Sequence, residues 1–107
     1  MHNVPEVSVQ DLPADAVILD VREDDEWAAG HVEGATHVPL GEVPARLGEL
    51  PDADPLYVIC RSGNRSGRAV AWLGQQGIET VNVAGGMRAW AASGRPMVAD
   101  TGAPTVI

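Results

Sequence analysis

Short apolar runs alternate with helical patterns along the chain, and small or charged residues follow most of these runs. The runs 16–19 and 57–59 are typical of buried strands and are too short for helices. Strands are therefore expected at 5–12, 16–19, 36–38, 57–59 and 78–83. Apolar spacing, an acidic first turn and glycine or proline signals predict helices at 23–30, 40–47, 66–76 and 87–92.

The alternation of strands and helices predicts an α/β fold. Its core would be a central, mostly parallel sheet of about five strands, with helices on both faces. Parallel sheets bind ligands beyond the carboxyl ends of their strands. Asp20 and Arg22, Cys60, and the turn 84–86 each follow an expected strand. We therefore expect these three segments to meet at one edge of the sheet.

Cys60, the single cysteine of the chain, follows the run 57–59 and precedes a loop that contains Gly63 and Asn64. Both of these residue types tolerate tight or left-handed backbone. Such a loop at the start of a helix turns its amide groups inward and makes a positively polarised cup. A thiol at the mouth of this cup would ionise more readily than a free cysteine. The segment therefore predicts a nucleophilic sulfur in an anion-binding loop.

The alternative for Cys60 is an inert position in the core, because free cysteine is among the most buried residue types. Two observations favour a nucleophile instead. A glycine-containing loop follows the thiol, and Arg61 and Arg65 add positive charge beside it. An inert core position needs neither feature.

Charge is divided unevenly along the chain, whose net charge is −8. Residues 1–59 hold 13 acids and two arginines, or −11, whereas residues 60–107 hold two acids and five arginines, or +3. An acidic body argues against nucleic acid and anionic membranes as partners. The positive half begins at Cys60 and suits a small anionic substrate. The chain has no lysine, which excludes Schiff-base chemistry and phosphate loops of the Walker type.

A single cysteine excludes an internal disulfide and a cysteine-cluster zinc site, so an external group must resolve any covalent intermediate. His31 and His37 are six residues apart, which fits no close metal-ligand spacing, and we expect no metal and no cofactor. Asp20 and Arg22 can face the same side at a strand end. We expect them to support the loop rather than to take part in the chemistry.

The length of 107 residues suits one domain that spans residues 1–107. Residues 100–107 show no periodicity and are expected to form a loose tail. No apolar stretch approaches the roughly 20 residues of a membrane span. The N-terminus lacks a basic segment followed by an apolar one, so we expect no signal peptide and a cytoplasmic protein.

Three segments carry a family resemblance: the loop 60–66, an N-terminal segment from Asp20 to Leu40, and the C-terminal segment 83–90. The N-terminal matches are Asp20-Val21-Arg22, Glu26-Trp27, Gly30-His31-Val32, Gly34-Ala35 and His37-Val38-Pro39-Leu40. In this order, the three segments resemble the signatures of the rhodanese (sulfurtransferase) family. Together they cover most of residues 7–95.

This resemblance implies a rhodanese-like fold and a single-domain sulfurtransferase in which Cys60 carries a persulfide. Backbone amides of the loop would hold the outer sulfur, and its arginines would attract an anionic donor such as thiosulfate. The substrate-binding residues implied in this way are Arg61, Ser62, Gly63, Asn64, Arg65 and Ser66. The expected partners are a small anionic sulfur donor and an external acceptor, which is cyanide, a thiol or a protein.

Two other functions stay open at this point. A rhodanese-like module could carry sulfur for a docked protein partner, or only dock that partner, without turning over free substrates. Cysteine phosphatases and arsenate reductases form the other class, and the phosphatases hold an oxyanion with an arginine six positions after the cysteine. That position is Ser66 here, and Arg65 comes one position earlier. The shorter spacing favours a loop that fits one extra sulfur atom.

Overall fold

Five parallel strands form the sheet of the computed structural model, which describes residues 4–107. Their order across the sheet is β1-β5-β4-β2-β3. Every neighbouring pair is parallel. The strands are β1 (Glu6–Ser8), β2 (Ile18–Asp20), β3 (Thr36–His37), β4 (Leu56–Ile59) and β5 (Thr80–Ala84). The α/β fold predicted from the sequence is confirmed.

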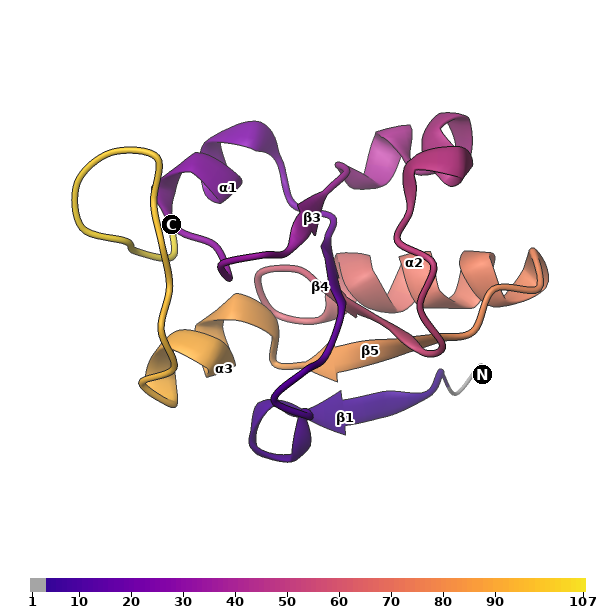
Figure 1. Cartoon of the computed structure of the whole chain (residues 1–107), viewed down its shortest axis with the longest axis horizontal. Helices are drawn as coiled ribbons and strands as arrows, with labels where there is room; N and C mark the ends of the chain where they lie inside the picture. Colours follow the sequence, from indigo (N-terminus) through magenta and orange to yellow (C-terminus); the bar gives the residue numbers. More distant parts are fainter. Residues whose placement is uncertain (1–3) are drawn as a thin grey trace.

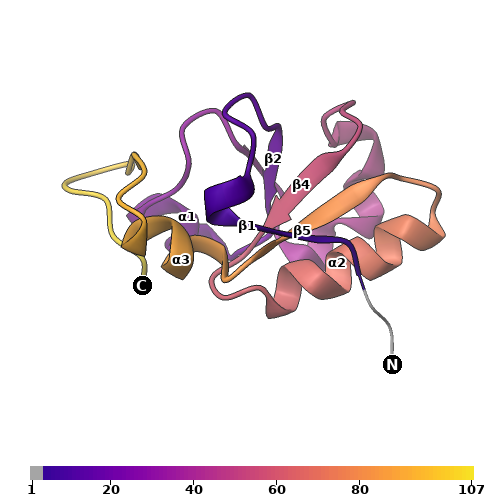
Figure 2. The same cartoon turned by 90° about the horizontal axis from the view of Figure 1, so that it is seen from below.

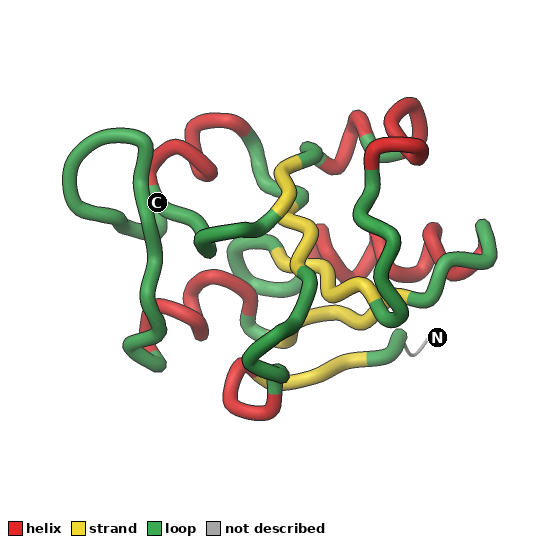
Figure 3. Tube along the Cα trace, viewed as in Figure 1, coloured by secondary structure: helices red, strands yellow, loops and turns green. Residues whose placement is uncertain are grey.

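Within residues 4–107, short and long helices connect these strands. The α-helices are α1 (Asp24–Ala29), α2 (Asn64–Gln75) and α3 (Gly86–Ala92). The 3-10 helices are η1 (Val9–Asp11), η2 (Leu40–Glu42) and η3 (Pro44–Glu49). Figure 3 shows these helices and the loops between them.

Most predicted boundaries differ from the structure by one or two residues, and three differences have a clear physical cause or consequence. The helix expected at 40–47 is divided into η2 and η3, because Pro44 has no amide hydrogen to continue η2. The strand expected at 5–12 ends at Ser8, whose hydroxyl accepts a hydrogen bond from the Asp11 amide at 3.3 Å and caps η1. Helix α2 begins at Asn64 rather than Ser66, so the second half of the loop 60–66 is the first turn of a helix.

The two faces of the sheet bury separate apolar clusters. Helices α2, η2 and η3 cover one face, and η1 and α3 cover the other (Figure 1, Figure 2). Side chains alternate between the faces along β4: Leu56 and Val58 point toward the α2 side, whereas Ile59 points toward the α3 side. Cys60 continues the alternation on the α2 side. The sheet therefore fixes the direction of the thiol.

The carboxyl ends of the central strands meet at one edge, as expected. The amide of Val21 donates to the Ile59 carbonyl at 3.0 Å, and the amide of Met87 donates to the Cys60 carbonyl at 2.7 Å. Gly86 allows this second approach, because its φ is +57° and a Cβ there would collide with the main chain of Cys60 and Arg61. The strand ends and the start of α3 thus hold the main chain around Cys60 from two sides.

The C-terminal segment, drawn as loop in Figure 3, returns to α1 at the same end of the molecule (Figure 1). The amides of Asp100 and Thr105 donate to the carbonyls of Ala28 and Ala29 at 3.0 and 2.9 Å. Gly30 permits the close approach, because a Cβ there would lie 2.5 Å from the Thr105 oxygen. Two residues of the segment expected to form a loose tail, Asp100 and Thr105, therefore have main-chain partners in α1.

Candidate active site

Cys60 lies between the end of β4 and the start of α2, and only 1% of its surface is exposed. Two groups contact its sulfur directly. The amide of Gly63 donates to Sγ at 3.1 Å, and the hydroxyl oxygen of Ser66 lies 3.2 Å from Sγ. Gly63 has a φ of +106°, in the left-handed region that favours glycine. The turn at Gly63 therefore aims an amide at a buried sulfur.

Burial raises the pKa of the Cys60 thiol, but the surrounding hydrogen-bonding groups outweigh this effect. The Ser66 hydroxyl, followed by the amides of Ser66, Gly63 and Ser62, lowers the pKa. The net result is a pKa below the ordinary value of 9.0. The loop thus favours a thiolate at a site that solvent hardly reaches.

Asn82 of β5 is a buried polar residue that the sequence interpretation did not connect with the site. Its exposed fraction is 2%, and its Oδ1 lies 2.5 Å from the Ser66 hydroxyl oxygen. Its Nδ2 donates to the Gly63 carbonyl at 3.2 Å and to the carboxylate of Glu6 at 3.1 Å. The available signal was its place between two valines in the expected strand 78–83, since a buried polar side chain needs partners.

Arg65 points its guanidinium at Glu26 of α1 in a two-point contact, with distances of 2.7 and 2.8 Å. The hydrogen bonds from Arg65 lower the pKa of Glu26 to about 2, although burial opposes this shift. Glu26 in turn raises the pKa of Arg65. The positive charge expected for substrate binding is therefore largely balanced by a partner from a distant part of the chain.

The other predicted loop residues have different surroundings. Arg61 is half-buried, and its Nε donates to the main-chain oxygen of Ile107 at 2.9 Å. Ser62 and Asn64 are exposed, and only the amide of Ser62 acts on the sulfur. The structure thus brings Gly63 and Ser66 to the sulfur and directs both arginines of the loop to other partners.

Asp20 and Arg22, expected to support the loop, form a fully buried ion pair. The guanidinium of Arg22 contacts both carboxylate oxygens of Asp20 at 2.8 to 3.1 Å. It also donates to the Gly30 carbonyl at 2.7 Å. This pair therefore joins the end of β2 to the residue that follows α1, next to the edge where Cys60 lies.

His31 and His37 stack on the indole of Trp27, with ring centroids 3.6 and 4.8 Å apart. One nitrogen of each ring also donates to a main-chain carbonyl, of Trp27 and Arg22 respectively, at 2.7 Å. Both imidazoles thus have local structural partners.

Residues 4–107 contain no group of three metal-ligating side chains. None of their helices has the length and apolar character needed to cross a membrane.

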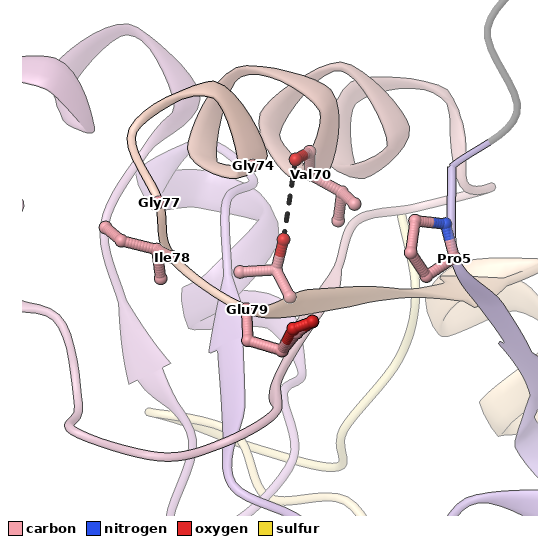
Figure 4. Close-up of a pocket in the computed structure, with 7 residues that line it drawn as sticks. Pro5, Val70, Gly74, Gly77, Ile78 and Glu79 are labelled. Atoms are coloured by element: carbon pink, nitrogen blue, oxygen red, sulfur yellow. Dashed lines mark hydrogen bonds between the residues drawn. The ribbon is translucent and has the colours of Figure 1, made fainter.

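Several hollows lie beside α2, and two of them lie toward its opposite ends. One of about 350 Å³ adjoins the outer side of the loop at Gly63 and Asn64, and Glu6 and Asn82 also line it. The other, of about 260 Å³, lies at the far end of α2, where Thr80 donates to the Val70 carbonyl at 3.4 Å (Figure 4). Because Thr80 begins β5, this second hollow is at the edge of the sheet opposite to the sulfur.

Known proteins resemble this chain in both sequence and fold. The YrkF protein of Bacillus subtilis, named as a candidate sulfur carrier, is 42% identical over 95 residues. That match covers 82% of this chain and 51% of YrkF, so the chain spans about half the length of that relative. A protein of Allochromatium vinosum named sulfurtransferase is 40% identical over 89 residues, covering 82% of this chain and 83% of the relative.

Solved structures agree with these matches. The crystal structure of a rhodanese-related protein from Thermoplasma volcanium superimposes with a TM-score of 0.82 and 33% sequence identity. The superposition covers 88% of this chain and 97% of that chain. A family model described as the rhodanese-like domain matches residues 7–93, which include most of β1, the loop around Cys60 and all of α3. On these matches and this fold, the chain belongs to the rhodanese-like domain family.

Proposed function

We propose that the protein is a sulfurtransferase that moves a sulfane sulfur from a small anionic donor, such as thiosulfate, through a persulfide on Cys60. The observation that carries this proposal is the buried sulfur of Cys60 with the Gly63 amide at 3.1 Å and a lowered pKa. A thiolate is the reactive form of cysteine, and a cup of amides suits the negative outer sulfur of a persulfide.

The reaction would proceed in two displacements on sulfur. The Cys60 thiolate attacks the outer sulfur of thiosulfate, a new S–S bond forms, and the old S–S bond breaks as sulfite leaves with its electron pair. A thiolate or cyanide then attacks the outer sulfur of the persulfide, and Cys60 leaves as a thiolate. The protein ends in its starting state and needs no cofactor.

Access to the sulfur supports a small first substrate. Because only 1% of Cys60 is exposed, a compact anion suits the approach to Sγ better than a bulky molecule. The added sulfur extends about 2.05 Å beyond Sγ, the length of one S–S bond, so that a larger acceptor can reach it. Amides of the loop residues 61–66 would hold this outer sulfur.

Arg61 and Arg65 are the proposed donor-binding cations. Arg61 is half-buried, and its side chain donates to the main-chain oxygen of Ile107. Among the described residues it forms no ion pair with a side-chain carboxylate, unlike Arg65. Arg65 is held by Glu26, and its charge is largely balanced. We therefore assign the larger share of donor binding to Arg61.

Mass spectrometry tests the proposal directly. After exposure to thiosulfate and removal of excess reagent, the intact protein should gain the mass of one sulfur atom on Cys60. The Cys60→Ser variant should show no gain under the same conditions. Equal behaviour of the two proteins would rule out the proposed intermediate.

A second candidate function is sulfur carriage for a dedicated protein partner in the cytoplasm. The similarity to YrkF, a candidate sulfur carrier, favours it. Turnover with thiosulfate and cyanide separates the two: a free-standing sulfurtransferase produces thiocyanate repeatedly, whereas a carrier loads once and stops.

Release of phosphate from an aryl phosphate would instead support a phosphatase. The contact of Arg65 with Glu26 argues against this function, because it occupies the guanidinium that would bind the phosphate.

A further inference from the structure

Asn82 is the side chain that contacts both groups facing the sulfur. Its amide reaches the carbonyl of Gly63, whose own N–H donates to Sγ, and it reaches the hydroxyl of Ser66. Asn82 is 2% exposed and Ser66 is fully buried. Water therefore cannot easily replace Asn82 or Ser66 as a hydrogen-bonding partner. The direction of the Ser66 hydroxyl hydrogen then decides whether Ser66 donates to the sulfur of Cys60.

The orientation of the Asn82 amide follows from its neighbours. The carboxylate of Glu6 at 3.1 Å and the carbonyl of Gly63 at 3.2 Å can only accept hydrogen bonds. Both therefore face Nδ2, the donor of the amide. The acceptor, Oδ1, is left facing the Ser66 hydroxyl at 2.5 Å.

Ser66 has one hydroxyl hydrogen and two acceptors within reach, Oδ1 of Asn82 at 2.5 Å and Sγ of Cys60 at 3.2 Å. When the hydrogen points to Asn82, a lone pair of Ser66 faces the sulfur and can accept from a thiol. When it points to the sulfur, two acceptor oxygens are left 2.5 Å apart in a buried place, which is costly.

We propose that Asn82 is a positioning residue of the sulfur site, because it competes with Cys60 for the single hydroxyl hydrogen of Ser66. The Ser66 hydroxyl, named above among the groups that lower the pKa of Cys60, can do so only when its hydrogen points to Sγ, and the contact with Asn82 opposes that orientation. Backbone amides would then be the main groups that stabilise the thiolate. A thiolate with fewer stabilising donors is a stronger nucleophile, because nucleophilicity falls as thiol pKa falls. This inference rests on the proposed function only in taking Cys60 as the nucleophile.

The test is the pH dependence of Cys60 alkylation by iodoacetamide, followed by mass spectrometry without any sulfur donor. Four proteins are compared: the unchanged chain, Asn82→Leu, Ser66→Ala and the double variant. Asn82→Leu also removes the bond to the Gly63 carbonyl, but it does so in both backgrounds. The difference between its effects with and without the Ser66 hydroxyl therefore isolates the competition.

Asn82→Leu should lower the alkylation midpoint more in the chain that keeps the Ser66 hydroxyl than in the Ser66→Ala background. The expected difference between the two effects is about one pKa unit. Additive effects of the two substitutions would overturn the proposal. The Ser66→Ala variant alone is a second test of the proposal, and this test remains valid even if Asn82→Leu does not fold. The proposal expects a midpoint within roughly half a unit of the unchanged chain, and a rise of about one unit or more would contradict it.

Thr80→Val is the matched control, since Thr80 is a buried polar residue at the other end of β5. It should leave the midpoint unchanged. The experiment is independent of sulfur transfer, because a protein that never takes sulfur from thiosulfate would still show the coupling. Failure of the thiosulfate experiment and failure of this one therefore have different meanings.

Discussion

The guanidinium of Arg65 and the carboxylate of Glu26 form a two-point contact that ties the first turn of α2 to α1. Both nitrogen–oxygen distances are short, 2.7 and 2.8 Å, and the two residues are 39 positions apart in the chain. Because Arg65 lies in the loop that surrounds Cys60, α1 and the sulfur site are joined through one ion pair.

This ion pair predicts a pH dependence of stability. The contact with Arg65 lowers the pKa of Glu26 from 4.5 to about 2. A carboxyl with a lowered folded-state pKa stabilises the fold above the unfolded pKa, and this contribution is lost as the pH falls from about 4.5 toward 2. Glu26→Gln should therefore cost about 1–2 kcal/mol at pH 7, after allowance for solvent screening.

Urea unfolding at a series of pH values measures this effect. The gap between the unchanged chain and Glu26→Gln should narrow steadily below pH 4.5. Glu42→Gln is the control, because Glu42 pairs with Arg46 on an exposed surface. It should show no measurable loss at pH 7. A constant gap between pH 7 and pH 3 would contradict the assigned role of Glu26.

A second prediction concerns Gly63, whose φ of +106° is unfavourable for any residue with a Cβ. Gly63→Ala should lower the free energy of unfolding by about 1–3 kcal/mol. It should also raise the pKa of Cys60, because the strained turn would no longer aim the Gly63 amide at Sγ. Thermal unfolding and the pH profile of alkylation measure the two effects.

Gly74→Ala is the matched control for this prediction. Gly74 lies in α2 with nothing within 4 Å of an added Cβ, and alanine is favoured over glycine inside helices. It should stabilise the protein by about 0.5–1 kcal/mol and leave the alkylation profile unchanged. If both substitutions changed the pKa of Cys60 by the same amount, the turn at Gly63 would have no special role in lowering it.

Local patterns were enough to predict the fold and the position of the sulfur. Short apolar runs determined the strands, and Cys60 stands directly after one of them, so its place at the sheet edge followed from parallel topology. The start of α2 was predicted two residues late, because the first turn at Asn64 buries no apolar side chain before Ser66 and so leaves no periodic signal.

Side-chain contacts between residues that are far apart in the sequence could not be predicted from the sequence. Glu26 and Arg65 each look like ordinary surface charges in the sequence, and only the packing of α1 against the loop makes them a pair. In the same way, Asn82 meets Ser66 because β5 runs beside β4. The expected donor-binding role of Arg65 was read from its place in the loop, which carries no information about Glu26.

The buried pair of Asp20 and Arg22 predicts a large loss of stability when one partner is removed. Both side chains are fully buried, and Asp20 makes three contacts with the guanidinium. Asp20→Asn leaves the charge of Arg22 without a balancing carboxylate, which should cost about 3–5 kcal/mol. Chemical unfolding measures the loss. Arg46→Ala, which breaks exposed pairs, is the control and should stay close to the unchanged chain.

The last prediction concerns donor binding by Arg61. If its charge attracts thiosulfate, Arg61→Ala should raise KM for thiosulfate about tenfold, which corresponds to one charge-assisted hydrogen bond of roughly 1.4 kcal/mol. Arg61→Lys keeps the charge and should recover most of the affinity, and added salt should narrow the difference between the variants. Arg65→Ala is a poorer test, because it also breaks the contact with Glu26. Steady-state kinetics with thiosulfate and cyanide, at low and high ionic strength, would measure these effects. A KM that is the same in Arg61→Ala and the unchanged chain would show that the donor binds without this arginine.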